Sequence, residues 1–81
     1  MRYASGQEVL PGDTVRIDTR YRGTVVGCIA ESKSLPPHTA DEWAFLKTGV
    51  MIDTDFGGLV HYPDESDLAE DQIELIGRLE K

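Results

Sequence analysis

Two pairs of short β-strand patterns, each joined by a tight turn, limit what this 81-residue chain can fold into. Apolar and polar residues alternate strictly over residues 14–18, TVRID, which places Val15 and Ile17 on one face. A run rich in β-branched residues, GTVVGCIA at residues 23–30, follows the polar connection 19–22. Strands this short are stable only when they pair, so we expect these two to form an antiparallel hairpin.

A second hairpin is expected from residues 50–53 and 59–62, because the TDFGG segment between them carries the glycines of a hairpin turn. Alternation separates Val50 and Ile52 from Met51 and Asp53, and it separates Leu59 and His61 from Val60 and Tyr62. Pro63 ends the second of these strands, because proline cannot donate to a strand ladder.

Gly27 lies in the middle of its strand pattern, where a glycine indicates a bulge or a sharp bend. Alternation through this segment places Val25 and Ile29 on one face, and Val26 and Cys28 on the other. A bend of this kind is what a small barrel needs where one strand passes between two sheets.

A short helix is expected over residues 40–47, after a loop at residues 31–38. Thr39 and Glu42 have the spacing of a capping box, in which each side chain satisfies a backbone amide of the other. Gly49 can end this helix, because glycine accepts the left-handed conformation that follows many helices.

Three remaining segments complete the pattern. Residues 6–13, GQEVLPGD, have the character of a strand start followed by a type II turn at Pro11-Gly12. The acidic segment 64–71 is expected to form a loop or a single helical turn, with Ser66 as its candidate cap. Residues 73–79, IELIGRL, are expected to form a closing strand.

These patterns predict a mainly β fold in a single domain, residues 1–81. We expect a small, partly open antiparallel barrel of about five strands. One short helix is inserted between the third and fourth strands, when the strand start in residues 6–13 is counted. A four- or five-stranded sheet with the helix packed on one face is the alternative. A chain of this size buries roughly 60 to 65% of its unfolded surface, so a deep substrate pocket is not expected.

Three segments resemble a known barrel family. Residues 12–17, GDTVRI, and 21–26, YRGTVV, resemble the opening of SH3-like barrels, including KOW-type modules, and residues 71–76, DQIELI, resemble the last strand of such barrels. The whole chain also resembles small, mostly uncharacterised bacterial proteins with a GVMI…GLVHY hairpin. The resemblance implies an SH3-like barrel, and KOW-type modules often bind RNA or ribosomal partners. This chain departs from those modules in its acidic second half.

Candidate catalytic and metal-binding groups are few. Cys28 lies inside a strand pattern with no helix N-terminus or cation beside it, so we expect a small buried residue rather than a nucleophile. His61 is expected at a partly exposed strand position beside a carboxylate, with Asp53 across the hairpin as the candidate. The acids after Pro63 lack the alternating ligands of a calcium loop. We therefore expect no catalytic residue, metal or cofactor.

Surface recognition is the remaining function class. Arg20, Tyr21 and Arg22 are expected at a hairpin tip, where two guanidinium groups beside an aromatic ring can grip an anion or a base. Trp43, Phe56 and Tyr62 are candidate aromatic anchors, and Asp64, Glu65 and Asp67 are candidate docking acids. Trp43 and Phe45 cannot share one helix face, so one of them should reach the surface.

The charge of the chain is uneven, with a net −7 that arises in its second half. These properties predict a non-enzymatic, acidic protein-binding module that docks on a basic partner, of the immunity type or an accessory subunit. The alternative is an RNA-binding, KOW-like module that uses the Arg20-Tyr21-Arg22 tip. We expect a cytoplasmic bacterial protein, a monomer or weak homodimer, with neither a signal peptide nor a membrane span.

Overall fold

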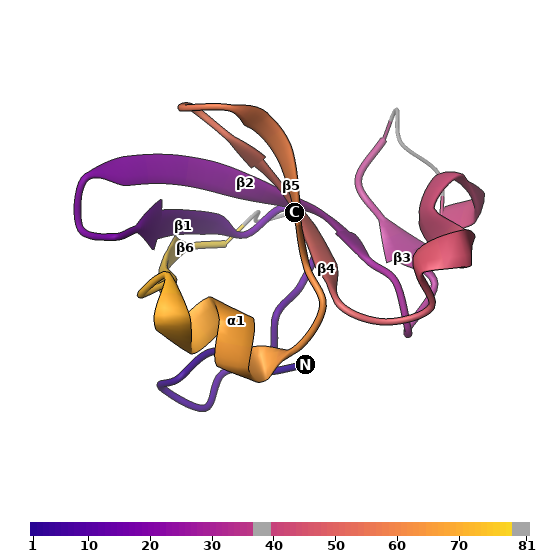
Figure 1. The fold of residues 1–81 in the computed structure, drawn as a ribbon, viewed down its shortest axis with the longest axis horizontal. Coiled ribbons are helices and arrows are strands. Elements are labelled where there is room, and N and C mark those ends of the chain that lie inside the picture. The colour runs from indigo at the N-terminus through magenta and orange to yellow at the C-terminus, as the bar shows by residue number, and fades with distance from the viewer. Residues whose placement is uncertain (37–39, 79–81) are drawn as a thin grey trace.

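The computed structural model describes residues 1–36 and 40–78, which form a mainly β domain built on one antiparallel sheet (Figure 1). In chain order the elements are β1 (Thr14–Ile17), β2 (Tyr21–Cys28), β3 (Lys33–Ser34), the 3-10 helix η1 (Ala40–Leu46), β4 (Val50–Thr54), β5 (Gly58–Tyr62), the helix α1 (Glu65–Glu70) and β6 (Glu74–Gly77). The strand order is β5-β4-β2-β1-β6, with β3 paired to β2. The described strands therefore leave β5 and β6 as two edges and do not close into a ring.

Both predicted hairpins are confirmed, and so is a short helix between the two hairpins. The described part of the chain contains six strands rather than about five, because residues 33–34 in the predicted loop pair with the end of β2. The predicted strand start in residues 6–13 is wrong, since that segment contributes only an isolated bridge between Arg2 and Glu8. The turn after it is confirmed: Gly12 has a φ of 96°, and the Asp13 amide donates to the Leu10 carbonyl at 3.1 Å.

A bulge in β2 changes which of its side chains share a face. The register between β2 and β4 shifts between Val25 and Gly27, so Val26 is the extra residue. The bulge was expected, but the predicted faces were wrong: Cys28 shares a cluster with Val25, and Ile29 shares one with Val26. One inserted residue reverses the alternation of every side chain that follows it.

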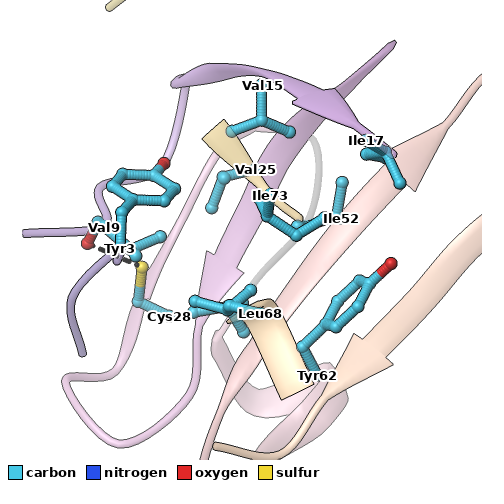
Figure 2. Packing of buried hydrophobic residues seen from close by; sticks show 11 residues of the cluster. Tyr3, Val9, Val15, Ile17, Val25, Cys28, Ile52, Tyr62, Leu68 and Ile73 are labelled. Atoms are coloured by element: carbon cyan, nitrogen blue, oxygen red, sulfur yellow. Dashed lines mark hydrogen bonds between the residues drawn. The ribbon is translucent and has the colours of Figure 1, made fainter. Parts of the chain in front are cut away.

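The larger apolar cluster, here called the first core, lies between the sheet, α1 and the N-terminal segment (Figure 2). Its buried members are Tyr3, Val9, Val15, Ile17, Val25, Cys28, Val50, Ile52, Tyr62, Leu68 and Ile73. They include two pairs that were predicted to share a face, Val15 with Ile17 and Val50 with Ile52. Both ends of the chain contribute, so this core forms only when segments far apart in sequence come together.

The smaller cluster, here called the second core, lies on the opposite side of β2 and β4. Val26, Ile29, Trp43 and Met51 are its buried members, and Leu35 and Leu46 pack against it. Two carbons of the Trp43 ring lie 2.5 and 2.7 Å from where a Cβ on Gly27 would stand, so the indole occupies the space that the missing side chain leaves. Figure 1 shows η1 and β3 on the side of the molecule away from α1.

A buried carboxylate joins the N-terminal segment to the sheet. Oδ2 of Asp13 accepts hydrogen bonds from the Tyr3 hydroxyl at 2.8 Å and the Leu10 amide at 2.9 Å. Nε of Arg78 lies 3.5 Å from Oδ1, and the same guanidinium donates to the Glu8 carbonyl. The Asp13 side chain is thus fully partnered, as a buried charge must be.

The two helices differ from their predicted forms. The 3-10 helix η1 ends at Leu46, and Lys47 takes a φ of 70° directly after it, so the left-handed position comes before Gly49. Thr39, half of the predicted capping box, lies outside the described residues. The cap of α1 is Asp64, which accepts from the amides of Ser66 and Asp67; the predicted cap, Ser66, donates its hydroxyl to Asp64 instead.

Candidate functional site

The β1–β2 and β4–β5 hairpins end next to each other. Asp18 and Thr19 form the first tip with φ values of 52° and 58°, and the Arg20 amide donates to the Ile17 carbonyl at 3.1 Å. Left-handed conformations are costly for a β-branched residue such as Thr19, so this tip is locally strained. Of the three residues predicted at the tip, Arg20, Tyr21 and Arg22, only Arg20 lies in the turn, since β2 begins at Tyr21.

An exposed aromatic pair joins the two tips. The rings of Tyr21 and Phe56 are 4.8 Å apart between centroids and tilted by 49°. The Asp55 amide donates to the Arg22 carbonyl at 3.0 Å, which extends the contact between β2 and β4 into the turn. Tyr21 is 36% exposed and Phe56 is 50% exposed, so the expected exposure of Phe56 is confirmed.

Charged groups surround the aromatic pair. The guanidinium carbon of Arg20 lies 5.8 Å from the Tyr21 ring centroid, within range of a cation–π contact. Arg22 lies directly across from Arg16 in the β1–β2 register, and both side chains are exposed. Among residues 1–36 and 40–78, neither of these two arginines forms an ion pair. We call Arg20, Tyr21, Arg22, Asp55 and Phe56 the tip surface.

Two of the predicted aromatic anchors are not on the surface. Trp43 is 7% exposed because it fills the second core under Gly27, and Tyr62 is 3% exposed because its ring packs in the first core. Their predicted role as exposed anchors is therefore wrong. Phe45, on η1, is 76% exposed, which confirms that one of Trp43 and Phe45 reaches solvent.

The three predicted docking acids take part in local structure around α1. Asp64 caps the helix, and the hydroxyl of Ser66 and the helix amides lower its pKa. Asp67 accepts from the Asp64 amide at 3.3 Å, and Glu65 accepts from the Arg2 amide at 2.9 Å. These roles explain the three acids within the fold itself, with no binding protein required, although each acid lies near the surface.

A groove runs between β5 and α1, and its walls carry the predicted docking acid Asp67 together with Glu70 and Asp71, which were not among the predicted site residues. The hollow has a volume of about 230 Å³ and is lined by Val60, His61, Tyr62, Pro63, Asp67, Glu70 and Asp71. The Tyr62 hydroxyl donates to Asp71 at 2.9 Å, and burial together with this bond raises the tyrosine pKa. Glu70 is exposed, and its side chain forms no hydrogen bond or ion pair with the other described residues. We call this the acidic groove.

The acidic groove adjoins the tip surface. The Asp18 amide, in the first tip, donates to the Asp71 carbonyl at 2.9 Å, at the end of α1. β5 begins two residues after Phe56 and ends in the wall of the groove. The pairing of Arg16 with Arg22 and the position of Glu70 both depend on register and on the placement of α1, which local patterns do not report.

Cys28 and His61, considered as a nucleophile and a base, are held in structural roles. Cys28 donates to the Val9 carbonyl at 3.4 Å, and burial raises its pKa to about 12, so the sulfur is a thiol at neutral pH (Figure 2). Nε2 of His61 donates to the Thr48 carbonyl at 2.9 Å. The predicted Asp53 partner is wrong, because the register places Asp53 opposite Leu59. His38 lies outside the described residues.

No group of three or more histidine, cysteine or acidic side chains suited to a metal ion occurs in the described part of the chain. Within the same residues, none of the helices has the length and apolar character needed to cross a membrane. Comparisons with family models, curated proteins and solved structures found no match to this chain. The tip surface and the acidic groove are the features of the described residues that bear on function.

Proposed function

We propose that this chain is a non-enzymatic module that binds another protein with a basic surface. The observation that carries the proposal is the exposed Tyr21–Phe56 pair at the two adjacent hairpin tips. Neither ring belongs to the first or the second core, so the fold does not require large aromatic side chains at these positions. Tyrosine and other aromatics supply much of the affinity at the centres of protein interfaces.

The surroundings of the pair suit such an anchor. The tips are held by the strand ladder, so the rings lose little freedom on binding. Arg20 and Arg22 beside them can form charge-assisted hydrogen bonds to a partner's carbonyl or carboxylate groups. The proposed anchors are therefore Tyr21 and Phe56, in place of the buried Trp43 and Tyr62.

The negative charge has a separate part in the proposal. At a net charge of −7, the chain attracts basic partners over distances of about a Debye length, ~8 Å at physiological salt. The Asp71 end of the acidic groove is hydrogen-bonded to Asp18 in the first tip, so the acids of the groove orient an approaching basic protein toward the aromatic anchors. This division gives the acids control of the association rate and gives the rings control of dissociation.

The same proposal includes a finer description of the fold and the biological type. The order β6-β1-β2-β4-β5, with one helix before the last strand, supports a partly open SH3-like barrel. A small acidic bacterial module of this kind suits an immunity-type protein that masks a basic toxin, or an accessory subunit of a larger complex.

Photo-crosslinking tests the proposal at the position that carries it. Benzoylphenylalanine is placed at position 56 in one version of the protein and at position 45 in another, and each is expressed in the native cell. Both positions hold exposed phenylalanines, so position 45, on η1 and outside the two hairpin tips, is a matched control. We expect a basic protein to be cross-linked from position 56 and not from position 45.

Two measurements decide the outcome. The adduct should weaken by about tenfold in a Tyr21→Ser background, and it should fall as salt rises from roughly 50 to 500 mM in a lysate. Equal adducts from both positions, an acidic partner, or a salt-independent adduct would each contradict the proposal.

The alternative of RNA binding has one specific observation in its favour, the presence of Arg16, Arg20 and Arg22 around two exposed rings. Single-stranded nucleic acids stack on such rings and need nearby cations. The net charge of −7 opposes this, so we expect no retardation of single-stranded RNA or DNA at about 50 mM salt. Clear retardation that is lost in the Arg20→Glu, Arg22→Glu double variant would reverse the ranking.

A further inference from the structure

The free edge of β5 lacks the features that usually protect an edge strand. Within residues 1–36 and 40–78, β5 pairs with β4 alone, so one side of its backbone has no strand partner. Its sequence, GLVHY, has no lysine, acid, proline or bulge. Leu59 is 45% exposed on this strand. Natural proteins rarely leave such an edge unguarded, because its unpaired amides and carbonyls are a template for another strand.

The other edge of the same sheet is different. β6 carries Glu74, an exposed charge. Arg78 follows the strand and is tied to Asp13 and to the Glu8 carbonyl. A charged strand with an anchored end matches the known ways of blocking edge pairing. The contrast marks β5 as the edge that is open to a partner.

We propose that the free edge of β5 binds an extended, basic segment of the partner protein as an added strand. The inference rests on the protein-binding function proposed above and specifies how part of the partner is held. Strand addition draws its affinity from main-chain hydrogen bonds and its specificity from pockets for alternate side chains.

The acidic groove defines the chemistry of that segment. Val60 and Tyr62 belong both to β5 and to the groove wall, so a strand added to this edge lies beside the groove. Successive side chains of the added strand point to opposite faces. Those on the groove side approach the carboxylates of Asp67 and Glu70, which favour lysine or arginine. Those on the other side lie next to Leu59, which favours aliphatic residues.

A second copy of this chain fits the edge less well. Each copy carries a net charge of −7, and pairing of two β5 edges would bring two acidic grooves together. The only titratable group on β5 that can become positive is His61, which already donates to the Thr48 carbonyl. Like charges that are brought together in this way oppose association.

Three synthetic probes test the proposal with the full-length protein. The first is the heptapeptide TKVKVKT, the second replaces each lysine by glutamate, and the third keeps the lysines but carries N-methyl groups on alternate amides. Binding is followed by fluorescence anisotropy and by NMR shifts of the backbone amides. We expect the lysine peptide to shift the β5 amides, and both other peptides to bind at least about tenfold more weakly.

A pair of charge-reversal variants locates the site. Glu70→Lys should weaken the lysine peptide by about tenfold, because Glu70 lines the groove and takes no hydrogen bond that the fold needs. Asp41→Lys makes the same charge change on η1, away from α1 in Figure 1, and should leave binding within about twofold. Circular dichroism confirms that both variants are folded.

Several results would overturn the inference. Equal binding of the N-methylated peptide would show attraction to the acids without strand addition. Shifts confined to α1, equal loss in the two variants, or no binding of the lysine peptide would also refute it. Concentration-dependent protection of β5 amides in the protein alone would assign the edge to a second copy. A cross-link from position 56 that persists after any of these failures would leave the protein-binding proposal standing.

Discussion

The two apolar clusters on either side of β2 and β4 are built on different principles. The first core joins residues from both ends of the chain, and its positions in β1, β4 and β5 follow simple alternation, whereas Cys28 joins it only because of the bulge in β2. The second core uses residues between positions 26 and 51 alone, and it depends on a bulge and on one glycine. Alternation is therefore enough to specify most of a core that spans the sheet, whereas the second cluster depends as a whole on a local defect in a strand.

The largest expected effect comes from Ile52→Ala in the first core. Ile52 is fully buried, so the change should lower the free energy of unfolding by about 3 kcal/mol, from lost burial and from the cavity left behind. Urea titration followed by circular dichroism measures this. Ile76→Ala, at a 41% exposed position on β6, is the control and should cost less than about 1 kcal/mol. Similar losses in both variants would mean that the first core does not dominate stability.

The next effect should come from Gly27→Ala, which attacks the second core directly. A methyl group there would overlap the Trp43 ring, so the indole must move, at a cost of about 1–3 kcal/mol. Trp43 is the only tryptophan in the chain, so its fluorescence reports on this cluster alone and should shift to longer wavelength. Gly57→Ala adds a methyl group with no atom within 4 Å and should change neither quantity appreciably. An unchanged emission spectrum in Gly27→Ala would contradict the packing of Trp43 against this glycine.

A smaller effect, the pH dependence of the free energy of unfolding, is expected from Cys28 in the first core. Burial raises the pKa of this thiol from 9.0 to about 12, so the folded chain keeps a proton that the unfolded chain releases. Its contribution to stability is complete below pH 9 and is lost progressively as the pH rises toward 12. At pH 10 the loss should be about 1 kcal/mol. Tyr3 and Tyr62 also have raised pKa values. The contribution of the thiol is therefore measured as the difference between the wild type and Cys28→Ala in the slope of unfolding free energy against pH. Equal slopes in the two proteins would show that burial does not raise the pKa of the Cys28 thiol.

The comparison of the two cores also shows how far sequence reasoning reaches. The hairpins, the turn at Gly12 and the grouping of side chains by face in β1, β4 and β5 follow from local alternation and turn chemistry, and these predictions are confirmed. The faces of β2 after the bulge were predicted wrongly, because alternation alone does not count an inserted residue. Burial of Asp13 also escaped prediction, since its partners Tyr3 and Arg78 come from opposite ends of the chain.

For the candidate site, position in a turn was a better guide than residue type. Exposure of Phe56 followed from its place in a turn, whereas burial of Trp43 depended on a contact with Gly27 that no periodicity shows. The pairing of Tyr21 with Phe56 requires the β2–β4 register, which places two turns from different hairpins together. Asp64 was predicted to be a docking acid because it is charged and near a turn, but its position is explained in part by its role as the N-cap of α1.

The smallest expected effect on stability is at the tip surface, and it separates that surface from both cores. Phe56→Ser removes a half-exposed ring whose recorded ring contact is with Tyr21, so it should cost less than about 1 kcal/mol. Phe45→Ser, on η1, provides the comparison in the same urea titration. A loss above about 2 kcal/mol would give Phe56 the behaviour of a core residue and remove the reason to treat it as an anchor. A small loss, together with a strong loss of cross-linking to the partner, is the combination that a ring kept for recognition requires, because folding then gains little from its presence.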